Sequence, residues 1–335
     1  MGQIDETSNI ALAKAGMESY VKYGYTTAQE GRATKDACEV WKKLGTSGDL
    51  KIDVVAYPDL QAEMNYMLNE GTQTNYSNHY RTGGIKLSLD GSPQGKTAWL
   101  TQPYSSSSDG SKGYPAIANN KEVQRLIDTA FVKKWQILAH CNGDASGDQY
   151  LNAIQNSVGK YGNEGRRDVM IHAQTARDDQ LDLMKELNVI PSFFGMHTYY
   201  WGDIHVKNLG KERAYRISPA ATAKKKGMIF TQHHDSPIVY PNSIMILHAV
   251  VNRTSRSGQV IGAEERISPY DALRSITTWA AYQHFEEDLK GDLSVGKLAD
   301  FVVLNKNPLK IDPSNIKDIK VIQTIKEGEL IYELE

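Results

Sequence analysis

Short apolar segments that end in polar residues recur along this chain and predict β-strands. Between most of them lie segments with the apolar spacing of amphipathic helices. The predicted strands cover residues 24–31, 51–59, 83–91, 136–144, 168–174, 189–197 and 227–236. The clearest predicted helices cover residues 8–23, 121–134, 175–187, 218–226 and 268–282.

Strands that alternate with helices predict an α/β fold with a parallel sheet, either a (β/α)8 barrel or a doubly wound sheet. No GxGxxG follows the first strand and no GxxxxGK[ST] is present, which disfavours a nucleotide-binding sheet. From about residue 291 the pattern changes to short strands without a long helix, at 298–304, 319–326 and 329–333. We therefore expect a main domain over 1–290 and a small β portion over 291–335.

Composition narrows the class of protein without naming a reaction. The 335 residues carry a net charge of −2, with 40% hydrophobic and 23% charged residues, as in an ordinary globular protein. Nothing in this balance predicts a nucleic-acid partner, and no apolar run has the length of a membrane span. The first ten residues lack the apolar core of a signal peptide, so we expect a cytoplasmic location.

Histidines stand at the ends of several predicted strands. They are His140, His172, His197 and the pair His233/His234, which Asp235 follows. In a (β/α)8 barrel these strand ends meet at one mouth, so residues distant in sequence become neighbours. One such histidine is more often structural than a ligand, but four strand ends with the same chemistry favour a divalent metal, with zinc first.

The stretch GGIKLSLDGS, residues 83–92, places a lysine in the middle of a predicted strand. Alternation puts Ile85, Leu87 and Leu89 on one face and Lys86 on the other, toward the polar strand ends. A buried ammonium is costly unless something receives it, so the strand predicts a special role for Lys86.

Several motifs together resemble the amidohydrolase superfamily. They are HCNGDAS from residue 140, VMIHAQ from 169, FTQHHDSP from 230 and the closing GKLADFVVLNKNPL from 296. The stretch GGIKLSLDGSPQGKTAWLTQPY from residue 83 and FFGMHTYYWGDIH from 193 are similar to the amidohydrolase family 3 branch, which includes N-substituted formamide deformylases.

This resemblance implies a (β/α)8 TIM-type barrel with a β-sandwich and one or two divalent metals at its mouth. By the resemblance, Lys86, carboxylated in many members, would be a metal ligand together with His140, His172 and Asp235. Asp235 would also handle the proton of the attacking water, and His197 and Trp201 would line the pocket for a small-molecule amide substrate. The implied activity is hydrolysis of carbon–nitrogen bonds, amide or N-formyl.

The chain departs from the family pattern at one motif. That pattern begins with a strand ending in HxH, and no HxH occurs in this sequence. We therefore expect a barrel that lacks strand 1, at most one zinc per chain and low activity. Self-association, or a missing segment supplied by another chain, would fill the gap.

Alternative functions remain open from the sequence. They are a non-catalytic fragment or degenerate barrel, an esterase that uses the same site, and a metal-free aldolase-type barrel with Lys86 as a Schiff base.

Overall fold

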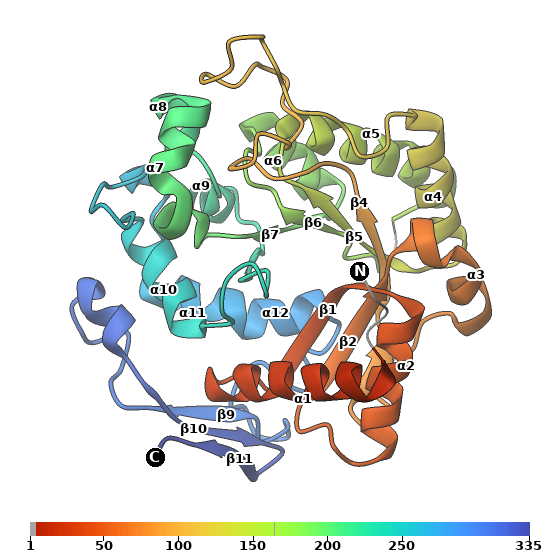
Figure 1. Cartoon of the computed structure of the whole chain (residues 1–335), viewed down its shortest axis with the longest axis vertical. Helices are drawn as coiled ribbons and strands as arrows, with labels where there is room; N and C mark the ends of the chain where they lie inside the picture. The colour runs from red at the N-terminus through yellow and green to blue at the C-terminus, as the bar shows by residue number, and fades with distance from the viewer. Residues whose placement is uncertain (1–4, 164) are drawn as a thin grey trace.

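Parallel strands form the centre of the molecule, and helices surround them (Figure 1). The computed structural model describes residues 5–163 and 165–335. One sheet has the order β1-β2-β3 and a second the order β4-β5-β6-β7-β8. Their bounds are β1 Thr27–Ala33, β2 Asp53–Pro58, β3 Tyr80–Thr82, β4 Gly84–Ser88, β5 Gln136–Cys141, β6 Val169–His172, β7 Ile190–Phe193 and β8 Thr231–Gln232. This confirms the predicted α/β fold with parallel pairing.

Gly83 separates β3 from β4; the sequence predicted a strand over 83–91, which corresponds to β4, and did not predict β3. A Cβ at Gly83 would lie 2.5 Å from a methyl carbon of Val55, so only glycine fits against the neighbouring strand. A parallel bridge between Asp59 and Lys86 joins the end of β2 to β4. The two sheets are thus continuous at the carboxyl ends of their strands.

The outer strands β1 and β8 lie near each other without pairing among the described residues. The Gln283 side chain spans the space between them, accepting from Thr231 Oγ1 at 2.7 Å and donating to Gln29 Oε1 at 3.3 Å. The row of strands therefore curls back on itself, but among the described residues hydrogen-bonded strands do not close it into a barrel. The sequence predicted a (β/α)8-type barrel that lacks strand 1.

Helices cover the outside of the strands. They are α1 Glu6–Lys22, α2 Lys35–Thr46, α3 Leu60–Glu70, α4 Asn120–Val132, α5 Asp144–Tyr161, α6 Asp178–Glu186, α7 His197–Leu209, α8 Lys211–Tyr215, α9 Ala220–Lys225, α10 Ser243–Asn252, α11 Pro269–Ile276 and α12 Thr278–Gln283. The predicted cap of α11 is present, because the Asp271 amide donates to Ser268 Oγ at 3.1 Å and Pro269 opens the helix. None of these described helices is long and apolar enough to cross a membrane.

Two predicted strands are shorter than the sequence suggested. The segment 189–197 leaves the sheet after Phe193, and His197 begins helix α7 instead of ending a strand. The segment 227–236 pairs only at Thr231 and Gln232. Its histidines and Asp235 therefore lie in the loop that follows β8, where the backbone can aim each side chain separately.

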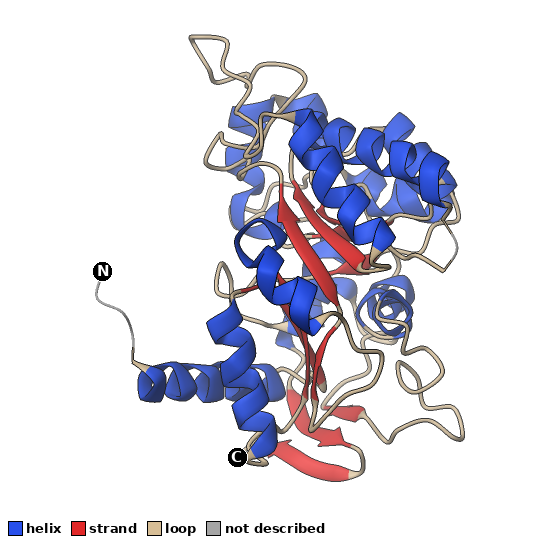
Figure 2. Ribbon diagram, turned by 90° about the vertical axis from the view of Figure 1, so that its right-hand side faces the viewer, coloured by secondary structure: helices blue, strands red, loops and turns tan. Residues whose placement is uncertain are grey.

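The C-terminal residues form a three-stranded antiparallel sheet, β9 Phe301–Leu304, β10 Val321–Lys326 and β11 Glu329–Glu333. It lies beside α1, below the parallel strands (Figure 2). Thr324 Oγ1 donates to the carbonyl of Val21 at 2.7 Å, which ties β10 to the end of α1. The predicted C-terminal β portion is therefore present, but in the described ranges it packs against a helix and not against a second sheet of a sandwich.

Candidate active site at the strand ends

The carboxyl ends of the strands in the five-stranded parallel sheet carry a group of polar side chains. We call Lys86, His140, His172, His233 and Asp235 the strand-end site; they come from β4, β5, β6 and the loop after β8. Three of the four ligand candidates predicted from the sequence stand on adjacent paired strands, because Lys86 lies beside Leu138 and Cys141 lies beside His172 in register. The structure therefore places these three residues on neighbouring strands of one sheet, and their roles as ligands stay a prediction.

Lys86 is buried, with 6% of its surface exposed. Its Nζ has no hydrogen-bond or ion-pair partner within residues 5–163 and 165–335, although its neighbours Ile85 and Leu87 pack in the core as predicted. Burial lowers the pKa of Lys86 to about 8, and the negative charge of Asp235 opposes that shift. The uncharged fraction of this amine near neutral pH is therefore a minority, but it is far larger than that of an ordinary lysine.

His140 and His172 face each other. His140 Nδ1 and His172 Nε2 lie 3.0 Å apart, with the rings edge to face at a centroid distance of 4.3 Å. Two imidazole lone pairs at this distance repel unless a proton or a metal cation lies between them. Neutral imidazole nitrogens are metal ligands, and burial lowers the pKa of His140 to about 3 and that of His172 below its usual value. The pair therefore fits a divalent metal.

The other nitrogen of His140 is held from the opposite side. His140 Nε2 lies 3.1 Å from the carbonyl of Gly91 and 3.1 Å from Asn142 Nδ2. Asp90 accepts from the amides of Asn142 and Gly143 at 2.9 and 2.7 Å. Asp90 thus ties the loop after β4 to the loop after β5 and so orients His140.

Asp235 occupies the loop after β8 in a left-handed conformation, with φ of 55°. Burial raises the pKa of its carboxyl group, and the positive charge of Lys86 counteracts this. The described residues show no hydrogen bond from Asp235 to His140 or His172. The structure thus brings Asp235 into electrostatic reach of Lys86 but not into direct contact with the facing histidines.

His197 and Trp201 lie beside this site on helix α7. His197 Nδ1 is 2.8 Å from His205 Nε2, and the His197 ring lies 4.8 Å from the Trp201 ring between centroids, tilted by 47°. Phe194 lies between this group and the strand-end site, 4.6 Å from the His197 ring and 5.3 Å from the His233 ring. His197 is only 3% exposed, so its side chain is anchored by packing as well as by His205.

Sequence reasoning missed two residues of this region. It counted His233 and His234 as a single strand end, but only His233 turns to His172, with 3.0 Å between His233 Nε2 and His172 Nδ1. His234 packs against Tyr20 and Tyr25 instead. His205 also went unnoticed, although its spacing of eight residues from His197 on a helix was a usable signal.

A second group of metal-ligating residue types lies at the opposite ends of the strands. Asp53, His79 and Glu327 approach one another closely enough to share an ion. The Asp53 carboxylate, however, is 2.5 Å from Lys290 Nζ and 3.0 Å from Lys326 Nζ. Two ammonium groups already neutralise it, so this group does not fit a metal cation.

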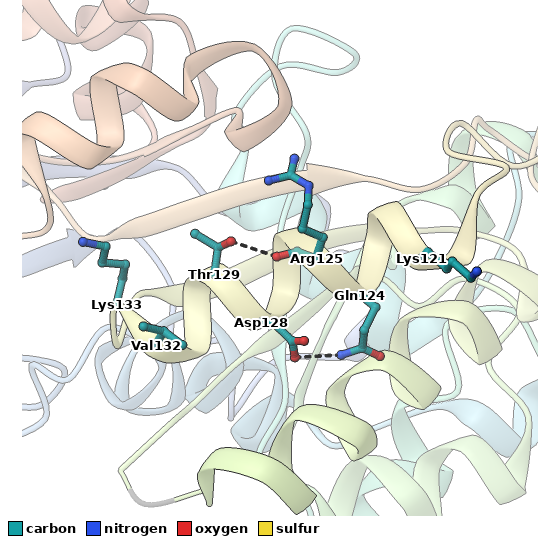
Figure 3. A pocket seen from close by; sticks show the side chains of 7 residues that line it. All are labelled: Lys121, Gln124, Arg125, Asp128, Thr129, Val132 and Lys133. Atoms are coloured by element: carbon teal, nitrogen blue, oxygen red, sulfur yellow. Dashed lines mark hydrogen bonds between the residues drawn. The ribbon is translucent and has the colours of Figure 1, made fainter.

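A surface hollow of about 480 Å³ runs along α4 (Figure 3). Its lining includes Gln124, Arg125 and Asp128, and no residue of the strand-end site takes part. Arg125 pairs with Glu122, and Asp128 accepts from Gln124 and Lys160.

Comparison with known proteins agrees with the resemblance seen in the motifs. The model described as "Amidohydrolase family" matches residues 3–332, nearly the whole chain. The chain belongs to the amidohydrolase family. An N-substituted formamide deformylase from Arthrobacter pascens is 20% identical over 333 residues, covering 97% of this chain and 60% of that protein.

Two further proteins similar to this amidohydrolase family chain come from a bacterium and an archaeon. YtcJ of Bacillus subtilis is 27% identical over 257 residues, covering 75% of this chain and 47% of YtcJ. A crystal structure of an uncharacterized metal-dependent hydrolase from Pyrococcus furiosus superimposes with a TM-score of 0.79 at 25% identity, covering 92% of this chain and 62% of that chain. The chain thus spans about half the length of the curated relatives it matches.

Proposed function

We propose that this chain carries the metal site of a hydrolase that cleaves carbon–nitrogen bonds, amide or N-formyl, in a small molecule. The observation that carries the proposal is the 3.0 Å approach of His140 Nδ1 and His172 Nε2 beside the unpaired amine of Lys86. Zinc is the first candidate for the ion, because imidazole is among its preferred ligands. When bound, such an ion would polarise a scissile carbonyl and acidify water.

Lys86 would join the ligands as a carbamate. Its lowered pKa leaves a free amine, whose lone pair forms a bond to carbon dioxide while one proton leaves to solvent. The product is an anion in place of a cation, and that change would remove the cost of the unpaired ammonium. Apart from Asp235, the other side chains of the site are neutral imidazoles, so a negative group on Lys86 suits a metal cation better than an amine.

Asp235 would be the general base and acid. Its buried carboxylate lies in the field of Lys86 and has a raised pKa, which suits a group that takes a proton from water and returns it to a leaving amine. His197 and Trp201 would shape the pocket for the rest of the substrate. The α7 aromatic residues supply an apolar wall beside the histidines.

The strand arrangement supports a (β/α)8-type barrel with an open side at β1. The Gln283 bridge draws β8 toward β1, yet in the described chain β1 pairs only with β2. An unpaired strand edge tends to recruit another strand. We therefore propose that β1 pairs with a strand of another chain or of a second copy. A single sharp monomer peak on size exclusion, with a cooperative melt, would contradict this pairing.

A non-catalytic role is the second candidate. Within the described residues, no third histidine, cysteine or carboxylate ligand atom lies close enough to both facing nitrogens to complete a metal cluster. Fewer than three protein ligands would bind a zinc ion weakly. This arrangement favours at most one ion per chain and low activity for the polypeptide alone.

One experiment separates these functions. The purified chain is equilibrated with zinc and bicarbonate, and its metal content and intact mass are measured together with hydrolysis of an N-formyl amine, an amide and an ester. One bound zinc, a mass gain of one carbon dioxide and cleavage of the C–N substrates support the proposal. Faster cleavage of the ester would favour an esterase. Zinc binding without turnover would favour the non-catalytic role, and no zinc uptake would refute the metal site.

A further inference from the structure

A continuous row of hydrogen-bonding groups runs behind the facing histidines. Ser192 Oγ lies 3.0 Å from His233 Nδ1, and His233 Nε2 lies 3.0 Å from His172 Nδ1. The far nitrogen of His172 then faces His140 at 3.0 Å. The row enters the core, because Ser192 on β7 is only 3% exposed.

The direction of the hydrogen bonds in this row decides which nitrogen of His172 is free. If Ser192 donates to His233, then His233 Nε2 carries its proton toward His172 Nδ1, and His172 Nε2 must carry the proton that blocks a metal. If His233 instead donates from Nδ1 to Ser192 Oγ, its Nε2 accepts from His172 Nδ1. Only this second direction leaves the His172 Nε2 lone pair open toward His140.

We propose that His233 and Ser192 are positioning residues for the metal site, because they set the tautomer and orientation of His172. This inference rests on the proposed function, since it assigns the partner behind one of its metal ligands. Metal-ligating histidines bind best when the second ring nitrogen donates to a fixed acceptor. His233 Nε2 is that acceptor, and the Ser192 hydroxyl fixes the tautomer of His233.

The geometry distinguishes this role from simple packing. His233 comes from the loop after β8, and its neighbour His234 turns away toward Tyr20 and Tyr25. Phe194 lies 5.3 Å from the His233 ring and 6.3 Å from the His172 ring, so an apolar side chain already fills space beside both. Packing alone would need no nitrogen at position 233.

The test compares zinc affinities of the full chain by competition with a chromophoric chelator. His233→Phe keeps the ring but removes the acceptor, and we expect about 10- to 100-fold weaker zinc binding. His233→Gln can place an amide oxygen near the Nε2 position, so its affinity should stay close to that of the wild type. His234→Phe is the matched control, with the same replacement one residue away and no expected loss. Melting of each metal-free variant shows whether stability changes in parallel.

Ser192→Ala is the second variant, in case His233→Phe does not fold. It removes the acceptor of His233, so zinc binding should weaken by a smaller factor, and ¹⁵N NMR of the zinc-loaded chain should show a mixed His233 tautomer. If the wild type binds zinc and His233→Phe binds zinc with the same affinity, this inference is wrong, but the proposed function is unaffected. The same holds for Ser192→Ala if its affinity and tautomer are unchanged. A wild-type chain that takes up no zinc would overturn both.

Discussion

The two ends of the parallel strands bury charge in opposite ways. At the amino ends, Lys290 and Lys326 are 6% and 4% exposed, and both contact the carboxylate of Asp53. At the carboxyl ends, Lys86 is equally buried at 6% but has no such partner in the described part of the chain. The lysines are buried to the same extent, but only Lys290 and Lys326 are paired. We therefore interpret those two as structural and Lys86 as available for chemistry.

The pKa shifts follow the same division. Burial would lower the pKa of Lys326, but Asp53 raises it above its usual value. Burial would raise the pKa of Asp53, but the two lysines lower it. At the strand-end site burial dominates, and Lys86, His140 and His172 all shift toward their uncharged forms. Buried charges are paired at the amino ends of the strands and unpaired at the carboxyl ends. Perturbed pKa values of this kind cluster at functional sites, which points to the carboxyl ends.

The largest expected effect is at the paired end. Asp53→Asn removes the carboxylate that Lys290 and Lys326 share. It leaves Lys290 with Glu286, and Lys326 with Asp300 and Glu327, as ion-pair partners. We therefore expect a loss of about 3 kcal/mol in the free energy of unfolding, the lower end of what breaking a buried pair costs. Urea denaturation measures it. A loss under about 1 kcal/mol would mean that this network is no more important than a surface ion pair and would remove the contrast between the two ends.

Removing the charge of Lys86, at the carboxyl ends of the strands, is expected to stabilise the protein. In CO2-free buffer at pH 7, Lys86→Met should raise the free energy of unfolding by about 3 kcal/mol, because the pKa of Lys86 falls from 10.5 to about 8 on folding. Urea denaturation of both proteins checks this. Destabilisation by the methionine would show that Lys86 is a paired structural residue.

The pH dependence sharpens this prediction. Between about pH 8 and pH 10.5 the unfolded Lys86 holds its proton while the folded one has lost it, so wild-type stability rises with pH across this window. The advantage of Lys86→Met should therefore be complete below pH 8 and shrink toward pH 10.5. Added bicarbonate should stabilise the wild type and leave Lys86→Met unchanged, since only the lysine can form a carbamate.

Metal binding is expected to depend on the strand-end site alone. His172→Ala removes a proposed ligand, so it should weaken zinc binding by at least about 100-fold, the upper end of what loss of a ligand's supporting partner costs. His79→Ala is the control, because His79 belongs to the ion-paired group at the other end. Chelator competition on both variants gives the ratio. Weaker zinc binding by His79→Ala would show that the metal site lies at the amino ends of the strands and not at the strand-end site.

The smallest effect is expected for the exposed pair at the strand ends. Arg32 Nε contacts Asp59 at 2.8 Å, but 67% of the Arg32 side chain is exposed. Arg32→Ala should change the free energy of unfolding by less than about 1 kcal/mol, because water screens such pairs. A thermal melt compared with that of Asp53→Asn tests this. A large loss would show that charge pairing matters equally at both ends.

The amino-acid sequence by itself determined the order of strands and helices and which residue types stand at the strand ends. Those features are local, since alternation of apolar residues and helix caps such as Ser268 depend on neighbours in the chain. The motifs around Lys86, His140 and His172 also sufficed to predict that these residues converge, because parallel strands share one end.

Only the tertiary structure decided which of these side chains meet. Whether His233 or His234 turns inward depends on the rings of His172, Tyr20 and Tyr25, which lie far away in sequence. The pairing of Lys290 with Asp53 spans 237 residues. His197 looked like a strand end and became the start of a helix, bonded to His205. Partners of buried polar groups are chosen by three-dimensional packing, which no local pattern encodes.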